Sequence, residues 1–493
     1  MTDELSSRTT EKHRDIPPGV FKDHAHKAVD WIAEYLENMD QYPVLARSRP
    51  GDVKAKIPHS PPANSEPFEK ITTDFREIIL PGITHWNHPR FFAYFSITST
   101  YPGIIGEMLC STLNVNAMLW KTSPSATELE EVVTDWVRQM LGLPENFLGV
   151  INDTASVSSL CAMAAAREYA GLNIRENGLA GGNLPKLRIY TSEEAHSSIE
   201  KAAIVLGIGQ RGVKKIPTDN NFRMDIPVLV RSVEEDISSG VKPICIIPTI
   251  GTTSSTSVDP VKEISEICRR HGIWLHVDAA YGGAAATVAE MRPLFTGWEA
   301  ADSIVVNPHK WLFTPLDCSI LYCQRPEVLR QAFSLTPEYL RTGEADSVTN
   351  LMDYGVSLGR RFRALKLWMI IRALGTKRIA NTIREHIAYA KRLAKIIEST
   401  SDFELLAPVP FSTLVFRFSP KVAIDDNTEI NSLNEKIMEA VNQTGQVFLS
   451  HTKLRGKYGI RLTIGNIKTT WEDVTLAWDI IRRKAKELSD SRY

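Results

Sequence analysis

The chain has 493 residues, of which 43% are hydrophobic and 23% are charged. This length and balance are typical of a globular protein with two or three domains and a large core. The formal net charge of −1 leaves no reservoir of basic surface, which argues against nucleic acid as the main partner.

The amino-terminal part predicts two helices. Apolar residues recur at helical spacing from Phe21 to Met39 and again from Phe68 to Ile79, where Pro81-Gly82 ends the pattern. The proline-rich segment between them can be neither a helix nor a central strand. Two helices joined by a long loop bury little surface by themselves, so we expect their apolar faces to need cover.

The first residues are polar and lack the apolar segment of a signal peptide, and no apolar run approaches the ~18 residues of a membrane span. Six cysteines are scattered without a CxxC pair, and most lie in apolar runs: Cys110, Cys161, Cys245, Cys268, Cys318 and Cys323. We expect buried free thiols in a cytoplasmic protein, and neither a disulfide framework nor a zinc site.

Residues 85–95, HWNHPRFFAYF, form an unusually aromatic cluster. Core packing is the ordinary role of such a cluster. His85 and His88 could suggest a metal, but no carboxylate or cysteine joins them at ligand spacing, so we do not expect one.

A run of βαβ units follows, which is typical of a parallel sheet with crossover helices. Apolar runs predict strands at residues 149–152, 187–190, 244–249, 272–278 and 303–306. Asp259-Pro260 is a favourable start for one intervening helix, which Gly272 ends. Gly207 to Gly212 matches GxGxxG, but the match follows a predicted helix, so we exclude a dinucleotide site.

Polar residues lie beyond the carboxyl ends of three of these strands, namely Thr249, Asp278 and Lys310. A lone lysine after a strand is by default a surface cation. An aspartate and a lysine at the ends of successive strands are, however, what pyridoxal phosphate requires: an acceptor for its pyridinium N–H and an amine that bonds its aldehyde. Ligands of open α/β sheets bind at this edge.

Thr154-Ala155-Ser156 opens a predicted helix after the first strand. The free N–H groups and the dipole of such a helix start favour a phosphate, although a plain N-cap explains these residues equally well.

The part after about Thr376 predicts a long helix and strands at residues 405–406, 413–418 and 460–464, hence a smaller α+β domain. Before it, Arg360 to Lys366 is basic, and we interpret it as a solvated or dimer-facing helix start rather than a nucleic-acid patch. The polar stretch from Tyr339 to about Val356 lacks apolar periodicity and predicts a mobile loop that could close over the site.

Four segments in this order and spacing, SEEAHSSIE, PTIGTTS, HVDAAYGG and NPHKW, resemble the group II pyridoxal-phosphate decarboxylases, in particular the aromatic-L-amino-acid decarboxylases. The resemblance extends from about Pro17 to about Glu487. It implies the aminotransferase-like fold type I with a mostly parallel sheet, pyridoxal 5'-phosphate as cofactor and an obligate homodimer. The implied division is a dimerisation segment (1–99), a large cofactor-binding domain (100–378) and a small domain (379–493).

The resemblance also implies the site residues. Cofactor binding falls to Thr154, Ala155, Ser156, His196, Thr249, Asp278, Ala280, Asn307, His309 and Lys310. Catalysis falls to Lys310, to Asp278, to His196, which would stack on the cofactor ring, and to Tyr339, which would protonate the α-carbon after CO₂ leaves. A lone loop histidine is otherwise more often a bystander, and Tyr339 would otherwise be a surface aromatic. Substrate binding falls to Trp86, Tyr94, Phe95 and Gly359.

The implied reaction converts an aromatic L-amino acid to its amine and CO₂. Gly359 leaves room for an indole or catechol ring, whereas Ser96, Ile97, Asn116 and Met118 depart from the usual pocket residues. An aldehyde synthase, in which Phe often replaces Tyr339, stays open, as does a decarboxylase of histidine or another amino acid. The intact Lys310, Asp278 and His196 argue against a non-catalytic pyridoxal-binding or nucleotide-binding protein.

Overall fold

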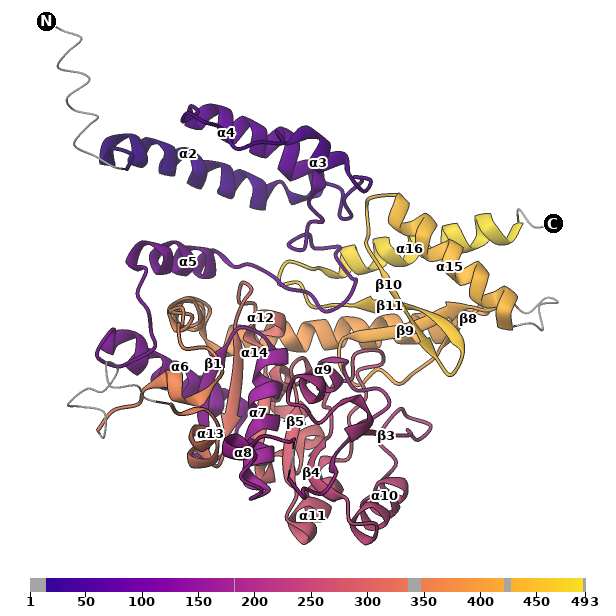
Figure 1. The fold of residues 1–493 in the computed structure, drawn as a ribbon. Coiled ribbons are helices and arrows are strands. Elements are labelled where there is room, and N and C mark those ends of the chain that lie inside the picture. Colours follow the sequence, from indigo (N-terminus) through magenta and orange to yellow (C-terminus); the bar gives the residue numbers. More distant parts are fainter. Residues whose placement is uncertain (1–14, 181, 336–346, 421–426, 491–493) are drawn as a thin grey trace, which may run out of the picture.

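The computed structural model describes residues 15–180, 182–335, 347–420 and 427–490. Its centre is a seven-stranded sheet with the order β1-β7-β6-β5-β4-β2-β3 (Figure 1). The strands are β1 (Leu148–Asn152), β2 (Leu187–Ser192), β3 (Val213–Ile216), β4 (Lys242–Ile247), β5 (Trp274–Asp278), β6 (Ser303–Val306) and β7 (Ser319–Cys323). Strand β7 is antiparallel to both of its neighbours, β6 and β1, and the other pairs are parallel. The expected α/β fold with a mostly parallel sheet is therefore confirmed.

Both faces of this sheet are buried. Successive strand residues point to opposite faces, and the residues on each face belong to a core. Ile246 and Leu275 belong to the core on one face, and Cys245 and Trp274 to the core on the other. The first face is covered by α6 (Pro124–Leu141), α10 (Ile226–Ser238), α11 (Val261–His271) and α14 (Ala364–Ser399), and the second by α7 (Ala155–Tyr169), α8 (Ile174–Asn177), α9 (Ser198–Val205) and α13 (Pro326–Phe333). These layers leave the carboxyl ends of the parallel strands available for a site.

Local sequence signals explain where several of these helices begin and end. Ser123 accepts a hydrogen bond from the N–H of Ala126 at the start of α6, and Gly272 ends α11 in the left-handed conformation with φ of 63°. The prediction that Asp259 caps α11 was wrong. The Asp259 carboxylate is buried and turns instead to the N–H groups of Thr249 (2.8 Å) and Met224 (2.7 Å).

The segment from Gly207 to Gly212 joins α9 to β3. It therefore lacks the preceding strand and the following helix of a dinucleotide fingerprint, which confirms its exclusion.

A second, antiparallel sheet with the order β10-β11-β9-β8 forms the carboxyl-terminal body (Figure 1). It contains β8 (Phe403–Leu405), β9 (Thr413–Phe418), β10 (Ser450–Leu454) and β11 (Lys457–Thr463), and it packs with α14, α15 (Asn427–Gln443) and α16 (Trp471–Asp490). This arrangement confirms the expected α+β pattern. The long helix α14 bends at Gly375, whose φ is 72°.

The amino-terminal helices α2 (Pro18–Glu37), α3 (Asp52–Lys56) and α4 (Phe68–Asp74) stand away from the rest of the chain (Figure 1). Helix α3 lies within the proline-rich segment, so the prediction that this segment contains no helix was wrong. Phe21, Val29 and Ile71 on these elements expose 63%, 44% and 47% of their surface, as expected for faces that need cover. The next helix, α5 (Tyr101–Leu113), packs against α14 and also exposes apolar side chains.

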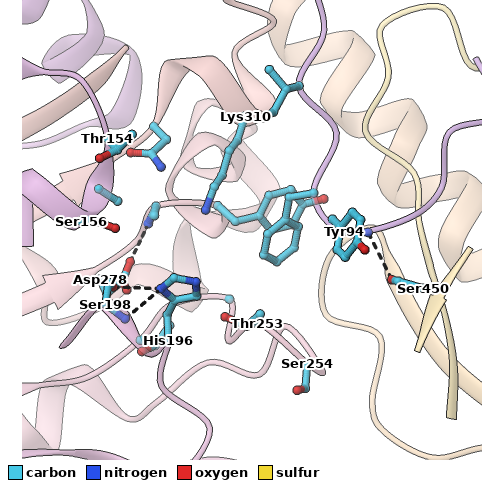
Figure 2. Close-up of a pocket in the computed structure, with 18 of the residues that line it drawn as sticks. Tyr94, Thr154, Ser156, His196, Ser198, Thr253, Ser254, Asp278, Lys310 and Ser450 are labelled. Carbon is cyan, nitrogen blue, oxygen red and sulfur yellow. Dashed lines mark hydrogen bonds between the residues drawn. The ribbon is translucent and has the colours of Figure 1, made fainter. Parts of the chain in front are cut away.

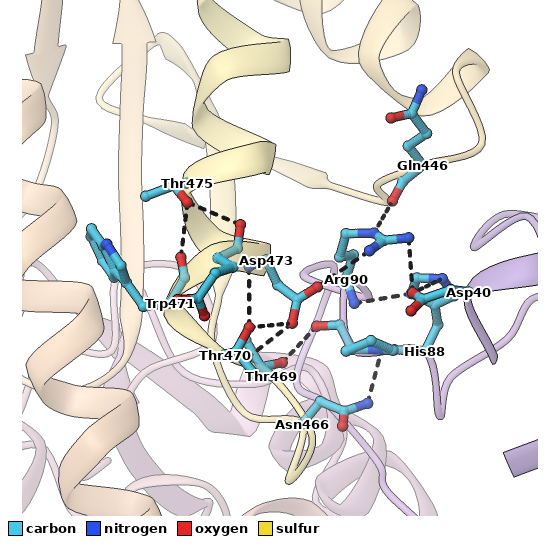
Figure 3. A network of polar contacts seen from close by, with 12 residues as sticks. Asp40, His88, Arg90, Gln446, Asn466, Thr469, Thr470, Trp471, Asp473 and Thr475 are labelled. Atoms are coloured by element: carbon cyan, nitrogen blue, oxygen red, sulfur yellow. Dashed lines mark hydrogen bonds and ion pairs between the residues drawn. The ribbon is translucent and has the colours of Figure 1, made fainter. Parts of the chain in front are cut away.

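The aromatic segment between α4 and α5 is attached to the small sheet. Phe92 is fully buried, and its N–H donates to Phe448 O at 2.9 Å. Arg90 forms ion pairs with Asp40 (3.0 Å) and Asp473 (3.3 Å), and so joins the amino-terminal segment to helix α16 (Figure 3). This segment thus packs with the carboxyl-terminal body, far away in the sequence.

In the basic stretch at the start of α14, Arg361 is half exposed, but the prediction of a solvated surface was wrong for Arg360 and Lys366. Arg360 and Lys366 are buried, with only 8% and 1% of their surface exposed. Arg360 contacts Glu130 at 2.6 Å, and Lys366 pairs with Glu107. These cations join α14 and the segment before it to helices α5 and α6.

All six cysteines are buried free thiols, as expected.

The polar stretch around Tyr339 lies in part outside the described residues, but Leu351–Tyr354 within it form a packed 3-10 helix rather than a mobile loop. His85 Nδ1 forms a hydrogen bond with the hydroxyl of Tyr35 at 2.7 Å. Over the described ranges, no helix has the length and apolarity needed to cross a membrane.

Candidate active site

A cavity of about 530 Å³ opens at the carboxyl ends of the parallel strands (Figure 2). This volume suits a small molecule. The large domain contributes Thr154, Ala155, Ser156, His196, Ser198, Thr249, Gly251, Thr253, Ser254, Asp278, Ala280, Tyr281, Asn307, His309 and Lys310. The opposite wall consists of Trp86, Tyr94, Phe95, Ile97, Ser450, His451, Thr452 and Arg461. Most of the site residues expected from the sequence therefore surround one cavity.

Lys310 lies in the short helix α12 (Pro308–Trp311), directly after β6. Its Nζ lies 5.1 Å from the centre of the Phe95 ring. Burial lowers the pKa of the Lys310 amine, Asp278 opposes this effect, and the nearby Arg461 cation adds to it. The amine therefore loses its proton more readily than a surface lysine and can act as a nucleophile.

Asp278 ends β5 and is buried. Its Oδ1 accepts a hydrogen bond from Ala280 N–H at 3.1 Å, and its backbone forms a parallel bridge with Thr249. Asp259 fixes Thr249 beside Asp278, because its carboxylate accepts a hydrogen bond from Thr249 N–H at 2.8 Å. Burial raises the pKa of Asp259 to about 7, although its two backbone donors favour the charged form.

The start of helix α7 forms another wall of the cavity. Thr154 occupies its N-cap position without a capping hydrogen bond from the side chain, and Ala155 and Ser156 follow in the first turn. The first N–H groups of a helix have no intrahelical partner and attract an anion. This end of the cavity therefore fits a phosphate group.

His309 is buried beside Lys310. Its Nδ1 accepts a hydrogen bond from Cys318 N–H at 2.9 Å, so the proton of the neutral ring lies on Nε2. Burial, with a contribution from Lys310, lowers the pKa of His309 to about 3, which keeps the ring neutral. Nε2 is thus available as a hydrogen-bond donor.

Three buried polar atoms in the cavity wall have no hydrogen-bond partner among the described residues: Thr249 Oγ1, Asn307 Oδ1 and Arg461 Nη2. Unpaired buried polar atoms are costly in a folded protein, so their presence in one cavity points to a polar ligand. Together with an amine, a carboxylate and a helix start, they fit pyridoxal phosphate and an amino acid.

Arg461 is the functional candidate that the sequence prediction missed. It lies in β11, only 4% of its surface is exposed, and its Cζ is 4.6 Å from the Phe95 ring centre. It donates to the carbonyl oxygens of Tyr94 and Ser254. Burial lowers the pKa of Arg461 to about 10, so it stays charged at neutral pH. The only sequence signal was a lone charge within an otherwise apolar strand.

The aromatic residues of the opposite wall are held in place by stacking. Phe95 stacks on Tyr281 with 3.9 Å between ring centres, and the Arg461 and Lys310 cations lie over the same ring. Tyr94 has φ of 51°, which is strained for an aromatic residue, and its N–H donates to Ser450 Oγ at 3.2 Å. Trp86 stacks on Phe91 and Tyr94.

One expected substrate-binding residue, Gly359, does not line this cavity. Gly359 lies on the exposed surface, where an added Cβ would be 3.8 Å from Asn116 Nδ2. Asn116 and Met118 also lie away from the cavity lining. Tyr339 is outside the described residues.

The chain is similar to known proteins along nearly its whole length. Residues 50–419 match the pyridoxal-dependent decarboxylase conserved domain. A tryptophan decarboxylase of Camptotheca acuminata is 40% identical, and a phenylacetaldehyde synthase of Petunia hybrida is 39% identical; the alignments cover 96% and 95% of both chains. The crystal structure of Oryza sativa TDC with PLP and tryptamine superposes with a TM-score of 0.93 at 34% identity, covering 97% of this chain and 99% of that one. The chain therefore belongs to the family of pyridoxal-dependent decarboxylases.

Proposed function

We propose that this protein removes the carboxyl group of an aromatic L-amino acid and releases the amine and CO₂, with pyridoxal phosphate as cofactor. The observation that carries the proposal is the cavity in which Lys310, Asp278 and the start of α7 face an aromatic wall with a buried arginine. The similar proteins named for tryptophan decarboxylation and solved with tryptamine support the aromatic substrate class.

The residues of the large domain would hold the cofactor. The bound cofactor supplies an electron-withdrawing ring system that accepts the electron pair left when CO₂ departs. Asp278 would accept the pyridinium N–H and keep that nitrogen protonated. Thr154 to Ser156 would hold the phosphate, with Asn307 and the Nε2–H of His309 as further polar contacts. Lys310 would bind the aldehyde carbon through its uncharged amine and later displace the product amine.

The opposite wall would orient the substrate. Arg461 Nη2 is a buried donor without a partner among the described residues, which suits the substrate carboxylate. Trp86, Tyr94 and Phe95 would contact the aromatic ring. His196 would stack on the cofactor ring and help to orient the carboxylate out of its plane, where the breaking bond overlaps the conjugated system.

We further propose a cytoplasmic homodimer with the domain division 1–99, 100–378 and 379–493. The exposed apolar side chains of α2, α4 and α5 support a partner surface. Gly359 is exposed, and so are its neighbours Val356 and Leu358, which expose 59% and 47% of their surface. A second subunit would explain how Gly359 contributes to substrate selection although it lies away from the cavity of its own chain.

An aldehyde synthase is the second candidate, because the similar phenylacetaldehyde synthase is 39% identical. In that reaction dioxygen oxidises the decarboxylated substrate, and aldehyde, ammonia and hydrogen peroxide replace the amine. Tyr339 separates the two candidates as a proton donor to the α-carbon. Changing Tyr339→Phe should therefore shift the product from amine toward aldehyde. Equal amine yields from both proteins would contradict this role.

The experiment that tests the proposed function measures products from a panel of L-amino acids with added pyridoxal phosphate. We expect CO₂ and amine in equal amounts from tryptophan or dihydroxyphenylalanine, and little peroxide. Turnover confined to acidic or small aliphatic amino acids would refute the substrate class. Peroxide in step with CO₂ would favour the aldehyde synthase.

A further inference from the structure

His196 lies two residues before Ser198, which contacts one of its ring nitrogens twice. Ser198 Oγ is 2.9 Å from His196 Nδ1, and the backbone N–H of Ser198 donates to the same atom at 3.2 Å (Figure 2). A backbone N–H can only donate, so Nδ1 must offer its lone pair. The neutral ring therefore carries its proton on Nε2.

The hydroxyl of Ser198 strengthens this arrangement. A hydroxyl can donate or accept, but here Nδ1 has no proton to give, so the hydroxyl must also donate. Ser198 is buried and lines the cavity, whereas the side chain of its neighbour Ser197 is exposed. Two adjacent serines thus differ in the one contact that matters for His196.

Charged groups on three neighbouring elements also act on His196. Desolvation in the cavity lowers the pKa of the imidazole, Asp278 of β5 opposes this effect, and Lys310 of α12 and Lys201 of α9 lower it further. The two donors at Nδ1 act in the same direction as the lysines, because a proton on Nδ1 would face two N–H or O–H groups.

We propose that Ser198 is a positioning residue that fixes the tautomer and the orientation of His196, so that the imidazole stays neutral with its proton on Nε2. The consequence for turnover rests on the proposed function, in which His196 stacks on the cofactor. The tautomer itself does not depend on which substrate the protein takes.

The test compares Ser198→Ala with Ser197→Ala, which removes a hydroxyl one residue away without touching His196. Diethyl pyrocarbonate modifies an imidazole nitrogen that carries a lone pair. In the wild type, the only ring nitrogen of His196 that carries a lone pair is Nδ1, which Ser198 contacts. In the full chain with pyridoxal phosphate bound, we expect Ser198→Ala to raise the modification rate of His196 about threefold to tenfold, the effect of losing one hydrogen bond. Mass spectrometry of the peptide that contains His196 measures this rate.

The pH profile of kcat/KM gives a second measurement. Loss of the hydroxyl makes Nδ1 easier to protonate, so the acid limb should move to higher pH in Ser198→Ala, and Ser198→Thr, which retains a hydroxyl, should restore it. Ser197→Ala should match the wild type in both measurements. Equal modification rates and superimposable acid limbs in the two alanine variants would overturn the proposal. Because the modification rate needs no turnover, a failure of the proposed substrate class would be recognised separately.

Discussion

At the scale of single residues, replacing Asp278 tests whether its negative charge is needed for turnover. Asp278→Asn keeps the size of the side chain, so the fold should persist, but an amide cannot hold the pyridine nitrogen protonated. A hydrogen bond to a charged group contributes ~1.5 to 3 kcal/mol, so we expect kcat to fall by at least about tenfold. Steady-state kinetics with an aromatic amino acid, together with circular dichroism of the variant, would measure this. Near-normal turnover would show that Asp278 does not have this role.

The residues that the apolar runs located without the resemblance share one property: they lie at or beyond the ends of predicted strands. Asp278 ends β5, and Lys310 lies in the short helix after β6. Arg461 and Ser198 were missed for different reasons. Arg461 reaches the cavity from the small sheet, far away in the sequence, and no local pattern predicts that approach. The role of Ser198 depends on ring geometry that periodicity does not contain.

At the scale of elements, the segment before α14 shows how charge patterns mislead. A run of basic residues predicted a solvated helix start, but Glu130 on α6 accepts from both the Arg360 guanidinium (2.6 Å) and Ile151 N–H (2.8 Å). The carboxylate that makes burial of Arg360 possible is distant in sequence. Buried charges require such partners, and a single sequence does not identify them.

This pair leads to a prediction about stability. Arg360→Ala would leave Glu130 as an uncompensated buried charge, so we expect the free energy of unfolding to fall by ~3 to 5 kcal/mol. Arg361 is the matched control, because its ion pair with Glu107 is at the surface, with half of the arginine side chain exposed. Arg361→Ala should cost at most ~1 kcal/mol. Denaturant unfolding would compare them, and equal losses would contradict this account of the pair.

The sequence prediction also missed some of the strands. The five strands that the apolar runs predicted in the large sheet are present, but β3, β7 and β10 were not predicted. Strands β3 and β10 are edge strands with polar, partly exposed residues, whereas β7 (Ser319–Cys323) is buried and lies between β1 and β6. Edge strands need not be apolar, which removes the signal that identified the others.

At the scale of the whole molecule, the fold class was predictable, because alternating strands and helices permit few arrangements other than a parallel sheet. The homodimer was expected only from the resemblance, and it stays a proposal. Apolar side chains on α5 that expose about half of their surface include Tyr101 (55%), Ile105 (49%) and Leu113 (57%). Monomeric proteins rarely expose such contiguous faces, so we expect a second subunit to cover them.

Ile105→Asp would place a charge in that face, and we expect it to weaken the dimer. Light scattering coupled to size-exclusion chromatography would measure the mass. Val205→Asp is the control, because Val205 is 72% exposed on α9, outside the proposed dimer surface. A wild type that is monomeric at working concentration, or two variants with the same mass as the wild type, would contradict the proposed interface.

The most direct test of the account is where the cofactor bonds the chain. Borohydride reduction makes the linkage between pyridoxal phosphate and a lysine amine permanent, and peptide mass spectrometry then locates it. We predict a single reduced pyridoxyl group on Lys310 in the wild type and its loss in Lys310→Ala, with the visible absorption of the bound cofactor lost as well. Labelling of another lysine, or unchanged labelling of Lys310→Ala, would contradict the assignment of this cavity as the catalytic site.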